Sequence, residues 1–154
     1  MNRLLWIVTV LLLSMVSYGQ EIKKNISVKE TAVVTYKSSW GPVQSGNAPI
    51  AQISAIAPAA ILVKDNSGNL YPVISFRINY IFKSTYRDDE TQELKVLKDL
   101  RVSDFYDTAQ LPATWVESIR DNIKTGDEIL YNKIMFRNKS GKMQLAPDVK
   151  IVAQ

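Results

Sequence analysis

The feature that most constrains the fold is a run of nine residues in which apolar and polar side chains alternate. From Ile74 to Phe82 the sequence reads ISFRINYIF, with an apolar side chain at every even-numbered position. A period of two over this length is typical of a β-strand with one buried face. A second alternating run predicts another strand, although Lys98 interrupts its apolar side. Its apolar members are Leu94, Val96, Leu100 and Val102.

Turn residues predict how the strands are joined. The segment DNSGN (65–69) separates two apolar runs, and its residue types favour a hairpin turn, so 60–64 and 70–82 are expected to pair antiparallel. The segment NKSGK (138–142) predicts a second hairpin between EILYNKIMFR and MQLAPDVKIVA. Because Pro147 cannot donate a ladder hydrogen bond, it is expected at a bulge or on an edge strand. Near the start, TAVVTY (31–36) predicts a short strand and 38–49 a loop.

One helix is predicted after residue 113. Thr114 and Glu117 have the spacing of a capping box, in which each side chain satisfies a backbone N–H of the other. Lys124 and Gly126 supply a basic last turn and a stop. The residues that share one face at helical spacing are Trp115, Val116, Ile119 and Ile123. Segment 50–60 fits a strand or a short helix equally well, since periodicity alone does not separate the two.

The N-terminus has the order of regions found in a secretory signal peptide. Arg3 precedes an apolar run of 13 residues, and small residues follow at Ser17 and Gly19. A membrane-spanning helix needs about 20 apolar residues, so cleavage after Gly19 or Gln20 is favoured over a retained signal anchor. The expected organisation is a signal peptide (1–19), an N-terminal strand and loop (20–45) and one domain (46–154). The mature protein is expected in the periplasm or otherwise outside the cytoplasm.

Composition excludes several kinds of chemistry. The chain contains no His and no Cys, so it has no Ser-His-Asp or Cys-His site, no disulfide and none of the usual zinc ligand sets. The acidic group at 88–90 is expected in a solvated loop rather than in a catalytic pocket. A net charge of +4 is too small to favour nucleic acid as a partner. We therefore expect no enzyme activity, cofactor, metal or stable membrane span.

Candidate binding residues lie in two places. Trp40, beside Gly41 and Pro42, could stack on a sugar or peptide or could plug the end of a β-sandwich. The final strand is expected at or next to a sheet edge, which can accept a strand from another chain. In that arrangement Val149 would face outward, while Lys142 and Lys150 would restrain unwanted pairing. Alternatively, this hairpin closes the sandwich and contacts no partner protein.

The part of the chain from residue 46 onward resembles a known domain. Tyr71 with Phe76 in the long strand, the segment IKTGDE (123–128) and Gly141 followed by LAPD (145–148) resemble the C-terminal domain of the gliding-motility protein GldM. The resemblance implies an immunoglobulin-like β-sandwich with one short helix. It also implies a periplasmic location, an association with type IX secretion or gliding machinery, and a role in protein contact without catalysis.

The sequence is compatible with two functions from different classes. The favoured one is an exported scaffold or interaction domain whose partner is a protein, with a homo-oligomer left open. The alternative is a carbohydrate-binding or hydrolytic envelope domain. A cleft lined by the rings of Trp40, Tyr86 and Tyr106 would favour the alternative, and scattered rings would favour the scaffold.

Overall fold

The computed structural model describes residues 34–154, and the signal peptide predicted at 1–19 lies outside them. The described part is mainly β, as predicted. Its elements, in chain order, are β1 (Tyr36–Trp40), β2 (Gly46–Ala48), α2 (Ile50–Ile56), β3 (Ile61–Asp65), β4 (Leu70–Tyr71), β5 (Val73–Arg87), β6 (Leu94–Tyr106), α3 (Ala113–Asn122), β7 (Glu128–Arg137), β8 (Met143–Leu145) and β9 (Val149–Ala153).

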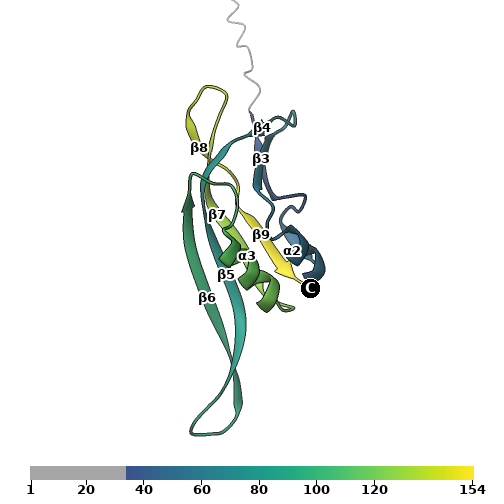
Figure 1. Ribbon diagram of the computed structural model, residues 1–154, viewed down its shortest axis with the longest axis vertical. Coiled ribbons are helices and arrows are strands. Elements are labelled where there is room, and N and C mark those ends of the chain that lie inside the picture. Colours follow the sequence, from purple (N-terminus) through teal and green to yellow (C-terminus); the bar gives the residue numbers. More distant parts are fainter. Residues whose placement is uncertain (1–33) are drawn as a thin grey trace, which may run out of the picture. The chain divides into compact units, whose positions relative to one another are not determined.

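The strands form two sheets that enclose the core as a β-sandwich (Figure 1). The small sheet has the order β1-β3-β4 and is antiparallel throughout. The large sheet has the order β2-β9-β7-β5-β6, with β8 paired to one end of β7. In Figure 1 α3 lies against β5 and β7 of the large sheet, and α2 lies beside β9. Arg120 joins the two helices by donating to the carbonyl oxygen of Ser54 at 3.0 Å.

The hairpin expected between 60–64 and 70–82 is only partly correct. β3 pairs with β4 for two residues, and then the chain passes to the other sheet. Pro72 has no N–H to continue the ladder, and its carbonyl oxygen instead accepts from the amide of Arg137 in β7 at 3.1 Å. β5 therefore pairs with β6 and β7 rather than with β3. The alternation predicted for this strand is confirmed at Phe76, Ile78 and Tyr80, which are buried, whereas Ile74 and Phe82 are only half-buried.

The N-terminal boundaries differ from those expected. The first strand begins at Tyr36, so positions 34 and 35 precede it, and 31–33 lie outside the described residues. Part of the expected loop at 38–49 is ordered in β1 and β2 instead. Gly41 ends β1 with a φ of +53°, and a Cβ there would lie 2.9 Å from Cβ of Ala59. This close approach explains why the chain turns at a glycine.

Two helices are present in residues 34–154, whereas one was expected. The ambiguous segment 50–60 contains α2, which buries Ile53 and Ile56. The capping box predicted for α3 is wrong, because Pro112 occupies the N-cap and no side chain caps the helix. Thr114 already lies in the first turn. The predicted apolar face is confirmed at the residues Val116, Ile119 and Ile123, which are buried.

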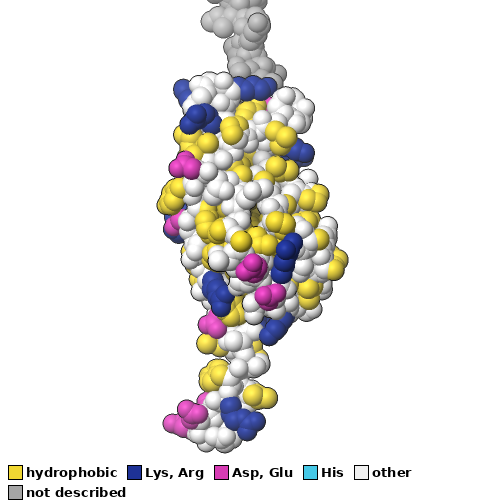
Figure 2. Space-filling view, in the orientation of Figure 1, with side chains coloured by type: hydrophobic (Ala, Val, Ile, Leu, Met, Phe, Trp, Pro, Cys, Tyr) yellow, Lys and Arg dark blue, Asp and Glu magenta, His cyan; other side chains and the backbone are white. Residues whose placement is uncertain are grey.

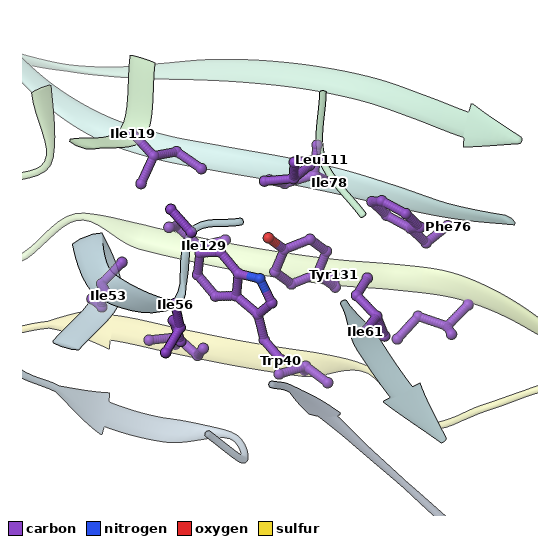
Figure 3. Close-up of a cluster of buried hydrophobic side chains, with 14 of the residues drawn as sticks. Trp40, Ile53, Ile56, Ile61, Phe76, Ile78, Leu111, Ile119, Ile129 and Tyr131 are labelled. Carbon is purple, nitrogen blue, oxygen red and sulfur yellow. The ribbon is translucent and has the colours of Figure 1, made fainter. Parts of the chain in front are cut away.

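Aromatic rings fill the middle of the core (Figure 3). The ring centroid of Trp40 lies 5.1 Å from that of Tyr131, which in turn lies 5.7 Å from that of Phe76. Trp40 is 0% exposed, and its Nε1 donates to the carbonyl oxygen of Ala59 at 3.1 Å. Trp40 is thus part of the core, and its alternative role as a binding platform is wrong. Burying a side chain of this size contributes more than the roughly 1.5–3 kcal/mol of a Leu or Phe.

The C-terminal hairpin differs from the prediction in the orientation of one side chain. Pro147 lies in the interruption between β8 and β9, as its missing N–H predicts. Val149 was expected to face outward but is 0% exposed, because it points into the core from the first position of β9. The other side of β9 pairs in parallel with β2. This segment therefore lies next to an edge, but β9 itself offers no free edge to a partner strand.

Candidate interaction surface

The large sheet has one face against the core and a second face, here called the outer face, directed away from it. Phe76, Ile78 and Tyr80 of β5 point to the core. Their cross-strand neighbours in β6 are the odd-numbered residues, and Phe105 among them packs on Phe76 and on Trp115 of α3. Side chains alternate between faces along a strand. The even-numbered residues of β6 therefore lie on the outer face.

An exposed apolar row follows β6 along this outer face. Its members are Leu94, Val96, Leu100, Val102 and Tyr106, which are between 44% and 71% exposed. Four of them, all except Tyr106, are the side chains whose alternation predicts the strand. An alternating strand normally directs its apolar side to the core, whereas here that side faces solvent. Half-buried Ile81, Leu130 and Val152 continue the apolar surface across β5, β7 and β9.

Ion pairs lie among these apolar side chains. The guanidinium of Arg77 donates to both carboxylate oxygens of Asp104, each at 2.7 Å, and this contact lowers the pKa of Asp104. Lys150 Nζ lies 2.7 Å from Glu128 Oε2 and lowers the pKa of that carboxyl group. Both acids are thus ionised near neutral pH. The outer face has an apolar row along β6, interrupted by Lys98 and Asp104, and a second ion pair between β7 and β9.

A hollow opens at the Tyr106 end of the outer face. It measures about 330 Å³, and its apolar walls include Tyr106, Met135 and Leu145. Tyr106 and Leu145 are both highly exposed. Asp104 and Lys133 also line it, so the hollow offers a few charged groups beside a mainly apolar wall. Such a depression can receive a side chain from a docked protein.

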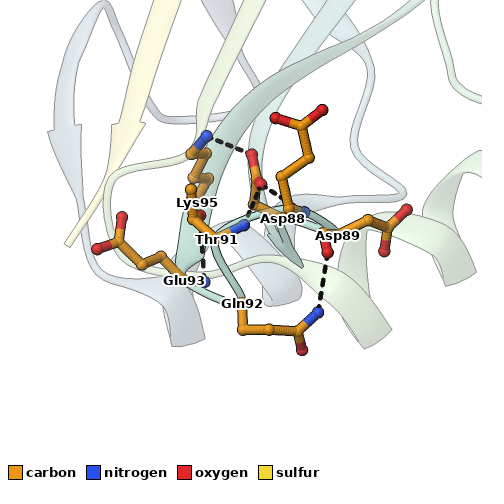
Figure 4. Close-up of polar contacts among 7 residues, drawn as sticks. Asp88, Asp89, Thr91, Gln92, Glu93 and Lys95 are labelled. Atoms are coloured by element: carbon orange, nitrogen blue, oxygen red, sulfur yellow. Dashed lines mark hydrogen bonds and ion pairs between the residues drawn. The ribbon is translucent and has the colours of Figure 1, made fainter.

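The tip of the β5–β6 hairpin is polar (Figure 4). The carboxylate of Asp88 accepts from the amides of Glu90 and Thr91 and from Lys95, and these contacts hold its pKa at about 2. Figure 2 shows acidic and basic side chains gathered at this end of the hairpin, with hydrophobic ones on the stem above. Asp88 of the acidic group at 88–90 therefore closes a turn, and its carboxylate accepts from the loop's own amides.

A second polar cluster lies at the other face, where α3 meets β7. Asp127 is 1% exposed, and its carboxylate accepts from the hydroxyl of Tyr80 at 3.0 Å and from the amides of Lys124 and Lys83 at 2.9 and 3.4 Å. Burial, together with this hydrogen bond, raises the pKa of Tyr80 well above its usual range. A cavity of about 280 Å³ lies beside the cluster. Because two of the three contacts join the α3–β7 connection to β5, we interpret the cluster as a structural tie.

The four candidate binding residues fall in different places. Trp40 and Val149 are buried, and Lys142 is exposed in the turn between β7 and β8. Lys150 alone lies on the outer face, where it is the cross-strand neighbour of Leu130. The apolar row of β6 was missed as a binding surface. Its alternation was visible in the sequence, but no sequence signal indicated which face of the strand would be covered.

The aromatic rings proposed as a carbohydrate site do not meet. Trp40 is in the core, while Tyr86 and Tyr106 lie near opposite ends of the β5–β6 ladder, opposite Lys95 and Ser75 respectively. These three rings line no common cleft. The arrangement therefore favours an interaction domain over the carbohydrate-binding alternative.

Comparison with known proteins adds no assignment: no family model matches the chain, and no curated protein matches its sequence. Within residues 34–154 the structure holds no helix with the length and apolar character needed to cross a membrane. The same residues contain no group of three or more acidic side chains placed to hold a metal ion.

Proposed function

We propose that this protein is an exported, non-enzymatic interaction domain of the cell envelope that binds other proteins through the outer face. The observation that carries the proposal is the exposed apolar row of β6. Contiguous exposed apolar surface is uncommon on monomeric proteins and marks sites of protein contact. The hairpin carries this row on a regular ladder of thirteen residue pairs, so the side chains are held in fixed positions.

The N-terminal signal pattern supports export, and the resemblance to the C-terminal domain of GldM supports a place in the periplasm. Absence of His and Cys from the whole sequence removes the side chains most used for acid–base and nucleophilic catalysis near neutral pH. At the hairpin tip the carboxylate of Asp88 accepts from the amides of its own loop. These observations favour binding over catalysis.

A pull-down from envelope extract tests the proposal. The mature protein is compared with a variant carrying Leu100→Lys and Val102→Lys, which places two charges in the apolar row. Leu70→Lys is the matched control, because Leu70 is a similarly exposed strand leucine in the small sheet. Partner proteins should be captured by wild type and by the control and lost, by about tenfold or more, in the double variant. Equal capture by all three folded proteins would refute a role for the outer face.

A further inference from the structure

The outer face ends at β6, which is the terminal strand of the large sheet. β6 pairs with β5 over its full length of thirteen residues and without a register shift. Within the described residues no strand pairs with its other side. A long regular edge strand is a template for pairing with another chain, and natural proteins usually shorten, bend or cover such edges. This edge is long and free of register shifts, and of the features that discourage pairing it has only charged side chains, among them Lys98 and Asp104.

Hydrogen bonds show which backbone groups of β6 are free. The amide of Asp88 donates to the carbonyl oxygen of Glu93 at 2.9 Å, so these two residues form a bonded pair at the end of the ladder. Bonded and non-bonded pairs alternate in antiparallel strands. The odd-numbered residues of β6 therefore bond to β5. Consistently, the amide of Lys83, the neighbour of Lys98, points toward Asp127 and away from β6.

It follows that the even-numbered residues of β6 direct their N–H and C=O groups to the open edge. These are the residues whose side chains form the apolar row on the outer face. An added strand would thus bond to the same residues whose side chains its own side chains would neighbour on the outer face. Backbone hydrogen bonds would supply affinity, and side-chain pairing on the outer face would supply the choice of partner.

We propose that the occupant of this edge is β6 of a second copy of this chain, paired antiparallel about a two-fold axis at Arg101. This inference rests on the proposed function, since it names a partner for the strand that carries the apolar row. In this register the cross-strand pairs on the outer face are Leu100 with Val102, Lys98 with Asp104 and Val96 with Tyr106, each occurring twice.

This register is favoured over its neighbours because charged and apolar side chains match across the two β6 strands. Moving the axis to Leu100 would place Val96 opposite Asp104, and moving it to Asp99 would place Lys98 opposite Leu100. With the axis at Arg101, apolar side chains face apolar ones and Lys98 faces an acid. Opposite charges that lie directly across strands stabilise a sheet, and like charges destabilise it.

Arg101 itself does not oppose the pairing. Its side chain lies on the core-facing side of the sheet, where Nη1 donates to Ser118 Oγ of α3 at 2.8 Å. The guanidinium carbon also lies 5.2 Å from the ring centroid of Phe82. These contacts hold each guanidinium toward its own chain. The two backbones can therefore approach at the axis without bringing the two charges together.

The remainder of the sheet favours a closed dimer over a fibre. A two-fold pairing uses the same edge from both copies, so both β6 edges are covered at once. The opposite edge of the large sheet is β2, which has only three residues and is followed by Pro49. Such a short edge gives little support to further pairing. The assembly therefore ends at two copies.

Single cysteines test the register, because the native chain has none. The mature protein is prepared with Cys in turn at each position from 99 to 103 and oxidised mildly, with Lys142→Cys as an exposed control in the turn between β7 and β8. A residue opposite its own copy at a non-bonded pair has a Cα separation of about 4.5 Å, which a disulfide can bridge. Arg101→Cys should cross-link most. A maximum at another position would overturn the proposed register.

Light scattering tests the pairing itself. Wild type should be dimeric, and Leu100→Pro, which removes only an edge-facing N–H, should shift to monomer, while Leu100→Ala should remain mostly dimeric. Should Leu100→Pro fail to fold, Val102→Lys is the second variant and should weaken the dimer by about tenfold or more. A monomeric wild type, or dimers unaffected by these changes, would overturn self-pairing. The proposed function is tested separately, by the pull-down, in which a different envelope protein must be captured.

Discussion

The carboxylate of Asp127 is predicted to be one of the most sensitive polar positions in the fold. Asp127→Ala removes the acceptor for the buried hydroxyl of Tyr80 and for the amide of Lys124. Leaving a buried donor without a partner costs about 1–3 kcal/mol. If the hydroxyl bears this cost in full and the more accessible amide bears part of it, the free energy of unfolding should fall by about 2–4 kcal/mol. In a domain of this size that corresponds to a decrease in Tm of roughly 8–16 °C.

Tyr80→Phe is the matched comparison. It removes the hydroxyl but leaves the carboxylate of Asp127 with its two backbone amides, so we expect a loss of only about 0.5–1.5 kcal/mol. In the double variant no buried hydroxyl is orphaned, and the combined loss should be smaller than the sum of the single losses by about 1 kcal/mol. Urea unfolding followed by circular dichroism measures all four proteins. An Asp127→Ala protein within about 0.5 kcal/mol of wild type would refute the structural role of this cluster.

Two further predictions concern the other sheet. Trp40→Ala should lower the free energy of unfolding by about 3–5 kcal/mol in urea titrations, because it empties the centre of the core; a loss below about 1 kcal/mol would contradict the buried position of this ring. The side chains of Asn69 and Tyr71 hold the pKa of Asp65 at about 2, below its ordinary 3.8. Since the folded-state pKa is the lower one, the stabilisation is present above pH 3.8 and is lost as pH falls toward 2. The difference in Tm between wild type and Asp65→Asn should therefore shrink over that range, and a constant difference would exclude the assigned cause.

Local patterns in the sequence were sufficient for the type of most elements. The alternation at 74–82 predicts β5, and the helical spacing from Trp115 to Ile123 predicts α3, because side-chain periodicity follows directly from backbone geometry. The missing N–H of Pro147 likewise predicts the break between β8 and β9. Each of these properties depends on a residue and its near neighbours in the chain, so no knowledge of the tertiary structure is needed.

The partners of the strands, by contrast, were decided only by the tertiary structure. DNSGN predicts a turn, but whether β5 continues beside β3 or crosses to the large sheet depends on Pro72 and on the pairing of β5 with β7, which begins more than forty residues later. The same holds for burial. Val149 and Leu100 both lie in alternating apolar runs, yet helices and the small sheet cover the face that holds Val149 and leave the face that holds Leu100 open. An alternating pattern specifies that two faces differ, and the packing of distant segments decides which of them meets water.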